Sequence, residues 1–135
     1  MSAATKSAVL PCTYAPAAGP YSPGVRKGSF LQTSGQLGLP PNSQPPVAGD
    51  APGLRDQVRQ ALANVGAVLA EAGANWEDVL MVRAYLSDPA DFAEFNAIYT
   101  DHLKTVTGPP PARTTVYVGL PHGLLVEIDA LAILG

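Results

Sequence analysis

The chain has 135 residues, which is the size of one domain with its own hydrophobic core. Hydrophobic residues make up 47% of the chain and charged residues 14%, which excludes extensive disorder and favours a surface that is hidden in an oligomer. Eight basic and eleven acidic residues give a net charge of −3, and the sequence contains no basic run, so we expect no nucleic-acid partner. No apolar run is long enough to span a membrane and the N-terminus does not resemble a secretory signal, so we expect a cytoplasmic protein without a membrane partner.

Cysteine and histidine usage does not favour a metal centre. Cys12 is the only cysteine and cannot form an internal disulfide. His102 and His122 are 20 positions apart, a spacing that fits neither a zinc fingerprint nor a helical pair. We therefore expect no metal site and assign both histidines structural or solvated positions.

Clusters of glycine and proline divide the chain into segments with clear hydrophobic periods. Residues 16–23 and 40–53 form two of these clusters and predict loops, because proline fixes φ and glycine permits positive φ. Between them, residues 29–34 predict a short strand that leads into a second extended stretch at 37–39. From residue 54 to 72 apolar residues recur at steps of three and four, which predicts an amphipathic helix.

The second half of the chain repeats strand and helix patterns. Residues 79–86 predict a strand by their length and composition, and apolar residues at helical spacing predict a helix over 92–103. After a third glycine and proline cluster at 108–111, two alternating segments predict strands at 113–118 and 124–133.

The element order is therefore β-β-α-β-α-β-β, an α+β sheet with two helices on one face. Two helices can cover only one face of such a sheet. The other face is expected to carry small and apolar groups and to need a partner, so self-association is the natural expectation.

Arg113 is the first candidate for a functional residue. It follows three prolines and an alanine and begins an otherwise uncharged strand. A guanidinium held in a fixed position can grip a carboxylate with two parallel hydrogen bonds. The alternative is an arginine at a strand end that forms an ordinary surface ion pair.

Glu127 is the second candidate, because it is an acid within an apolar strand. Burial would raise its pKa and a neighbouring arginine would lower it, and such a carboxylate can orient or deprotonate a water molecule. The alternative is that Glu127 and Asp129 both face solvent on the outer side of an edge strand.

Four further residues are weaker candidates, because they are also common in turns and helices. Tyr21, Ser34 and Gly35 lie beside loops, where binding groups concentrate. Ser34 could offer a hydroxyl group and the Gly35 backbone could approach a ligand closely. Asn96 lies in the second predicted helix and could brace a neighbouring loop.

Five segments, in this order, resemble the YjgF/RidA family of reactive intermediate deaminases. The resemblance extends over nearly the whole chain, and its most specific parts are the Pro-Ala-Arg-Thr step and the Val-Glu-Ile-Asp-Ala strand. The segments are GPYSPG at 19–24, TSGQ at 33–36, DFAEFNAIY at 91–99, PARTTV at 111–116 and VEIDALA at 126–132.

The resemblance implies a chorismate-mutase-like fold over residues 15–135 and a homotrimer with clefts between subunits. It does not cover the N-terminal arm at 1–14, which we expect to be partly disordered. It also implies a cofactor-free hydrolase that deaminates enamines and imines of the 2-aminoacrylate and 2-iminopropionate type to 2-keto acids and ammonia. Such an activity detoxifies the intermediates that pyridoxal-phosphate dehydratases release. On this basis the catalytic residues are Arg113 and Glu127, and the substrate-binding residues are Tyr21, Ser34, Gly35, Asn96 and Thr115.

Thr115 departs from the family pattern, because many members have a cysteine two residues after the arginine. Thiol chemistry at that position is therefore not expected here. Two alternatives to the general deaminase stay open: a pathway-specific deaminase of an aminomuconate-like compound, and a non-catalytic trimer that binds small carboxylates or a protein. Ribonuclease activity, which has also been assigned to family members, is disfavoured by the acidic charge.

Overall fold

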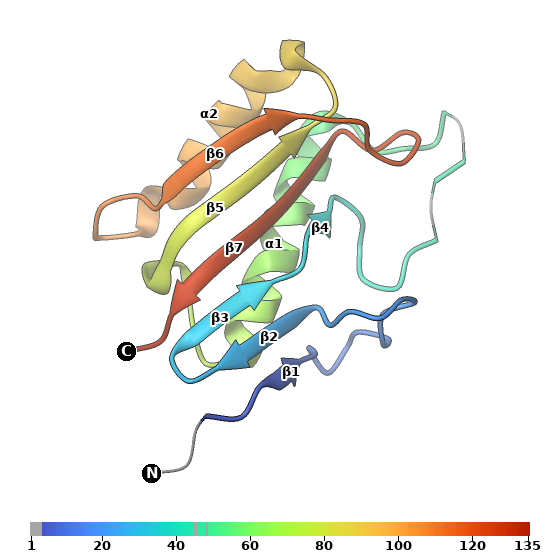
Figure 1. The fold of residues 1–135 in the computed structure, drawn as a ribbon. Coiled ribbons are helices and arrows are strands. Elements are labelled where there is room, and N and C mark those ends of the chain that lie inside the picture. Colours follow the sequence, from blue (N-terminus) through green and yellow to red (C-terminus); the bar gives the residue numbers. More distant parts are fainter. Residues whose placement is uncertain (1–3, 45, 48) are drawn as a thin grey trace.

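The computed structural model describes residues 4–44, 46, 47 and 49–135 and shows two helices on one face of a single sheet (Figure 1). The strands are β1 (Ser7–Val9), β2 (Gly24–Lys27), β3 (Phe30–Thr33), β4 (Gln36–Leu37), β5 (Val79–Leu86), β6 (Ala112–Tyr117) and β7 (Val126–Ile133). The helices are α1 (Leu54–Glu71) and α2 (Phe92–His102), with short 3-10 turns η1 (Trp76–Asp78), η2 (Pro89–Asp91) and η3 (Leu103–Thr105). None of the helices in the described ranges combines the length and apolar character needed to cross a membrane.

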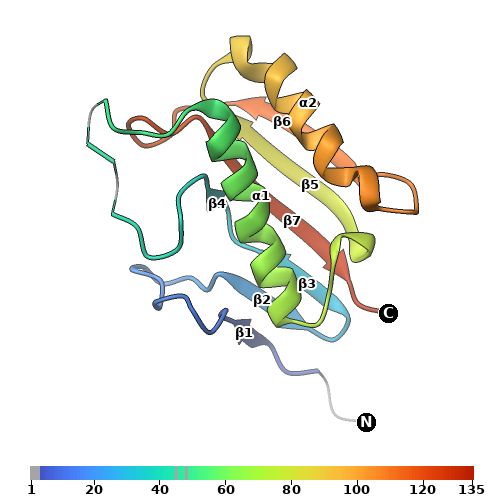
Figure 2. The same cartoon turned by 180° about the vertical axis from the view of Figure 1, so that it is seen from behind.

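The sheet has the strand order β1-β2-β3-β7-β5-β6, and the short β4 also pairs with β7. All pairs are antiparallel except β5 and β6, which run parallel and are joined through α2. A parallel pair needs such a crossover, and the helix of the crossover packs on the sheet. As a result β7 lies in the middle of the sheet, β6 forms one edge, and both helices lie on the same side (Figure 2).

The core lies between the helices and the sheet. Alternate residues of β7, from Val126 to Ala132, are fully buried against it, as are Leu62 and Leu69 of α1. The segment directly after β4 approaches α1 so closely that a Cβ atom on Gly38 would overlap with the carbonyl oxygen of Gln57. The absence of a side chain at position 38 therefore allows this segment to lie directly against the backbone of α1.

The predicted α+β fold with two helices on one face is confirmed. The helix predicted at 54–72 and the strand predicted at 79–86 correspond to α1 and β5 almost residue for residue. The sheet also contains two strands that the sequence did not suggest, because β1 and β2 are too short for a clear period. β1 lies within the expected arm at 1–14 and pairs with β2, while residues 1–3 lie outside the described residues.

The uncovered face of the sheet differs from the expectation. It carries the apolar residues Met81 and Leu131, but also a charged and polar group formed by Arg83, Tyr85 and Asp129. The expectation of a small and apolar face is therefore wrong. The physical reason is strand alternation: polar side chains at every second position of β5 and β7 point away from the helices and gather on this face.

Candidate functional site

Glu127 lies on the uncovered face of the sheet, in its central strand. The register places it beside Tyr85 of β5 and Leu37 of β4, and its side chain is half-buried. Burial, and secondarily the negative charge of Asp129, raises the pKa of Glu127 above its usual range. The alternative of an edge strand that exposes Glu127 and Asp129 to solvent is wrong, because β7 pairs on both sides and Asp129 is buried.

Gly35 packs directly against Glu127. A Cβ atom on Gly35 would lie 2.7 Å from the carboxyl carbon of Glu127 and 2.9 Å from Oε1. These distances are shorter than any side-chain contact would allow. The absence of a side chain at position 35 thus leaves the space that the carboxyl group occupies.

Ser34 and Tyr21 lie next to this contact. The Ser34 hydroxyl donates to the carbonyl of Ser22, and its backbone N–H donates to the carbonyl of Pro23 at 2.8 Å. Ser34 therefore ties the loop of Tyr21 to the end of β3, and its hydroxyl proton is already engaged. Tyr21 is 61% exposed at the rim of a cavity of about 470 Å³ that Ser34 and Gly35 also line.

Arg113 lies on the other side of the sheet, under α2. Its guanidinium carbon is 4.8 Å from the ring centroid of Tyr99, 5.5 Å from that of Phe95 and 5.8 Å from that of Phe92. Three aromatic rings thus hold the cation through cation–π contacts. Within the described residues Arg113 takes part in no ion pair, so the alternative of an ordinary surface ion pair does not hold in this chain.

A second cavity, of about 570 Å³, opens beside Arg113. Its wall combines the guanidinium with mostly apolar groups from the end of α2 and from the proline-rich segment before β6. The lining residues are Tyr99, Thr100, Leu103, Lys104, Val106, Gly108, Pro110, Pro111 and Arg113. A cation in an apolar wall is suited to a small organic acid.

Asn96 and Thr115 belong to the same side as Arg113. Thr115 follows Arg113 by two residues on β6, and its buried hydroxyl has no hydrogen-bond partner in the part of the chain that is described. Asn96 lies half-buried on α2, where its backbone carbonyl accepts a hydrogen bond from the Thr100 hydroxyl at 2.7 Å. Neither residue is among those that line the two cavities.

The sheet separates the two catalytic candidates. Arg113 pairs with Val82 and lies on the helix-covered face with it, whereas Glu127 pairs with Tyr85 and faces the opposite way. A single chain therefore does not bring Arg113 and Glu127 together. It brings together Glu127, Gly35 and the Tyr21 loop on one side, and Arg113 with Thr115 on the other.

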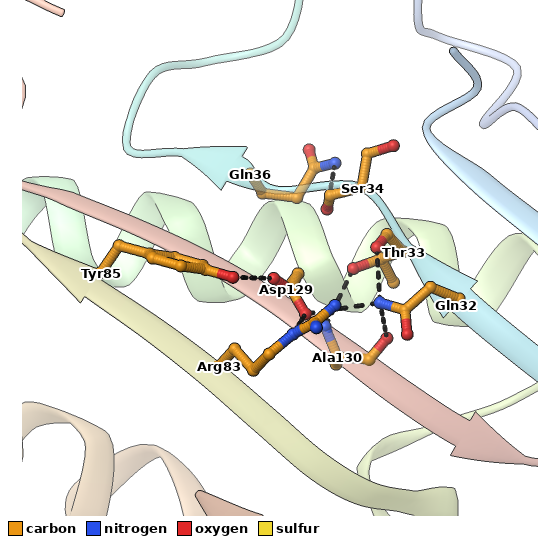
Figure 3. Close-up of polar contacts among 8 residues, drawn as sticks. All are labelled: Gln32, Thr33, Ser34, Gln36, Arg83, Tyr85, Asp129 and Ala130. Carbon is orange, nitrogen blue, oxygen red and sulfur yellow. Dashed lines mark hydrogen bonds and ion pairs between the residues drawn. The ribbon is translucent and has the colours of Figure 1, made fainter. Parts of the chain in front are cut away.

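One polar cluster near Glu127 was missed by the sequence reasoning (Figure 3). Asp129 accepts hydrogen bonds from Arg83 Nε at 2.8 Å, from the Tyr85 hydroxyl at 2.9 Å and from Gln32 Nε2 at 3.4 Å. The signal was present in the sequence, because Arg83 and Tyr85 alternate in one strand and Glu127 and Asp129 alternate in another. Only the pairing of β5 with β7 shows that the two sets share a face.

Comparisons with known proteins agree with this architecture. Residues 12–134 match the family described as Endoribonuclease L-PSP. A RutC family protein of Synechocystis is 41% identical over 128 residues, covering 93% of this chain and 95% of the relative. The mouse protein named 2-iminobutanoate/2-iminopropanoate deaminase is 40% identical over 129 residues, covering 94% of this chain and 91% of that protein.

Solved structures show the same fold. The YjgF gene product of E. coli superimposes with a TM-score of 0.82 at 32% identity, covering 94% of this chain and 98% of that one. The E. coli TdcF structure with bound serine gives a TM-score of 0.83 at 30% identity, covering 96% of this chain and 99% of that one. The chain therefore belongs to the YjgF/RidA family, as its motifs predicted.

Proposed function

We propose that this protein hydrolyses imines of small 2-keto acids, of the 2-iminopropanoate type, to the 2-keto acid and ammonia. The observation that carries the proposal is Arg113, a guanidinium without an ion-pair partner in the described chain, held by aromatic rings at the wall of a cavity. Every such substrate carries a carboxylate, which the planar guanidinium of Arg113 can bind with two parallel hydrogen bonds. The name of the mouse relative supports the reaction, and the serine bound to TdcF supports a small amino or imino acid as ligand.

Glu127 would act as the general base and general acid of the reaction. Water oxygen adds to the imine carbon, the electron pair of the C=N bond moves to nitrogen, and nitrogen takes up a proton. The carbinolamine then loses ammonia as the C–N bond breaks and the carbonyl group forms. The Glu127 carboxylate would accept a proton from the attacking water and pass it to the imine nitrogen. It would then accept the hydroxyl proton of the carbinolamine and pass it to the leaving nitrogen, and a raised pKa suits both transfers.

We further propose that the complete site forms between two copies of the chain. Arg113 and Glu127 lie on opposite faces of the sheet, so one copy would supply Arg113 and its neighbour would supply Glu127 with Gly35. Arg113 lies on the edge strand β6, from which it can reach a second copy. This arrangement is consistent with the homotrimer that the family resemblance implies.

A trapping assay tests the reaction. An amino-acid oxidase or a serine dehydratase generates the imine, semicarbazide competes for it, and the protein is added as wild type or as Arg113→Ala. We expect less semicarbazone with wild type and the uncatalysed amount with the variant. Undiminished semicarbazone with alanine-, serine- and leucine-derived imines would refute the general deaminase and leave the pathway-specific enzyme or the binding protein.

Mixing tests the shared site. Arg113→Ala and Glu127→Gln chains are unfolded together and refolded, alongside each variant refolded alone. If each site combines Arg113 of one chain with Glu127 of another, random mixing at equal amounts restores about a quarter of the wild-type activity. Activity that stays at the level of the separate variants contradicts a site between chains.

RNA cleavage is not our proposal, although the description of the matching family refers to an endoribonuclease. The chain has a net charge of −3, and binding to the phosphate backbone depends on clustered basic residues. We expect no binding of single-stranded RNA even at low salt. Binding that weakens steeply with added salt would revive the ribonuclease hypothesis.

A further inference from the structure

Asp129 is held more firmly than any other acid on the uncovered face. Three hydrogen bonds reach its two carboxylate oxygens, from Arg83, Tyr85 and Gln32, which come from two different neighbouring strands. The side chain of Asp129 is only 8% exposed, whereas that of Arg83 is 51% exposed. The acid is therefore fixed in a poorly solvated position while its partner reaches into solvent.

Asp129 and Glu127 are neighbours on one face of β7. They are two residues apart in a strand, so their side chains point to the same side at a spacing of roughly 7 Å. Solvent is partly excluded between them, because Glu127 is half-buried and Asp129 is buried. Their charges are consequently screened less than those of two carboxylates in water.

We propose that the Arg83–Asp129 ion pair is a positioning element that sets the charge experienced by Glu127, with Asp129 disfavouring ionisation of Glu127 and Arg83 limiting that effect. This inference rests on the proposed function, in which Glu127 exchanges a proton with water and ammonia. Within one copy of the chain, the residues that surround Glu127 leave few other charges to play this part; in the proposed site between copies, Arg113 of the partner subunit would add a positive charge that is the same in every variant compared below. From β5 come Arg83 and Tyr85, from β7 comes Asp129, and the described residues of β3 and β4 contribute only neutral groups.

Tyr85 and Gln32 have a different part in this arrangement. Neither carries a charge at neutral pH, and each donates a hydrogen bond to Asp129. Tyr85 is also the direct neighbour of Glu127 across the sheet. Burial raises the pKa of the Tyr85 phenol above its usual range, so it remains a donor at physiological pH.

Two substitutions distinguish this electrostatic role from a structural one, because the proposal predicts that they move the ionisation of Glu127 in opposite directions. Asp129→Asn removes a negative charge and leaves the Arg83 cation, so Glu127 should ionise at lower pH. Arg83→Gln removes the cation and leaves Asp129, so Glu127 should ionise at higher pH. We expect each midpoint to move by about half a pH unit or more.

The measurement is a carbon NMR titration of the full chain labelled at the glutamate carboxyl groups. The chain has four glutamates, and comparison with Glu127→Gln assigns the relevant resonance. Matched controls are Asp56→Asn and Arg55→Gln, which make the same charge changes on the exposed side of α1. Midpoints that stay fixed, or that move in the same direction in Asp129→Asn and Arg83→Gln, overturn the proposal.

The pH dependence of kcat/KM for imine hydrolysis gives the second readout. Its acidic limb should move in the same two directions as the NMR midpoints. The Arg83 side chain is 51% exposed, so we expect Arg83→Gln to fold even if Asp129→Asn does not. The direction in which its midpoint moves then tests the proposal without Asp129→Asn. A wild-type protein that fails to hydrolyse imines while the NMR midpoints still move oppositely would refute the proposed function and leave the electrostatic coupling established.

Discussion

Gly35 and Glu127 fit together only because residue 35 has no side chain: a Cβ atom there would lie 2.7 Å from the carboxyl carbon of Glu127. The resemblance implied Gly35 as a substrate-binding residue through its backbone. The structure gives it a second effect, which is to leave the space for the carboxyl group. A glycine in a loop thereby fixes the position of an acid that lies 92 residues later in the chain.

Gly35→Ala should lower activity without unfolding the protein. The added methyl group displaces the Glu127 carboxyl group, and a displacement of about 1 Å can cost about a hundredfold in kcat. The Glu127 side chain is half exposed and can move aside, so the free energy of unfolding should fall by only about 1 kcal/mol. Steady-state kinetics and denaturant titration check both values. The control is Gly119→Ala, where an added Cβ atom meets nothing within 4 Å; equal activity of the two variants would contradict the role of Gly35.

Arg113→Lys should raise KM much more than it lowers kcat. Lysine keeps the positive charge but loses the planar fork that binds both carboxylate oxygens, so we expect KM to rise about tenfold. Lys104 lines the same cavity and forms an ion pair with Asp101 at 2.8 Å. Lys104→Ala should leave KM within about twofold of wild type, because exposed ion pairs contribute little. A similar rise of KM in both variants would show that the cavity attracts substrate by charge alone.

Gln57→Leu should destabilise the fold by about 3 kcal/mol. Gln57 is fully buried, and its amide donates to the carbonyls of Pro52 at 2.7 Å and Gly123 at 3.0 Å while its oxygen accepts from the N–H of Leu125 at 2.8 Å. Leucine fills the space but leaves these backbone groups unpaired. Thermal and chemical unfolding measure the loss. Arg59→Leu on the exposed side of α1 serves as the control, and an equally stable Gln57→Leu would mean that water replaces the lost bonds.

His102 should titrate below its usual pH range. Burial lowers the pKa of His102, and the nearby charge of Asp101 opposes this only in part. Its ring lies 4.9 Å from that of Trp76, the single tryptophan of the chain, so protonation should quench the tryptophan fluorescence. We expect a quenching midpoint below pH 6.5. His102→Gln should abolish the transition, His122→Gln should preserve it, and a midpoint at or above 6.5 in wild type would contradict the burial argument.

The stability of the fold should follow the same titration. Because the pKa of His102 is lower in the folded state, the unfolded chain takes up this proton first as the pH falls. The contribution of the neutral, buried His102 to the free energy of unfolding is therefore fully present above about pH 6.5. It is lost progressively as the pH falls towards the pKa of His102 in the folded state. Denaturant midpoints measured between neutral and mildly acidic pH should decrease less in His102→Gln than in wild type.

The sequence supports some elements of this fold far better than others, for physical reasons. α1 and β5 are long and carry uninterrupted apolar periods, so local pattern alone defines them. β1 and β2 have three and four residues and form only because each finds a partner strand. Their existence depends on contacts between distant parts of the chain, which no local period records.

The candidate site shows the same division. Alternation along one strand predicts that Arg113 and Thr115 share a face, and that Glu127 and Asp129 share a face. It does not predict whether these two faces coincide, because that depends on the register of β6 with β5 and of β5 with β7. The Arg83–Asp129 ion pair joins residues 46 positions apart and depends on that same register.

The outer edge of β6 has no partner strand within the described part of a single copy. Val116 and Tyr117 expose apolar side chains on a strand that pairs on one side only within the described ranges, and Val118 does so directly after it. Such an edge recruits other chains without specificity, although the prolines at 109–111 lack N–H groups and prevent a foreign strand from extending past that end. Under the proposed association of copies, a newly synthesised chain is open to aggregation and degradation until a second copy covers β6, so the cellular abundance of the protein would follow the speed of that association.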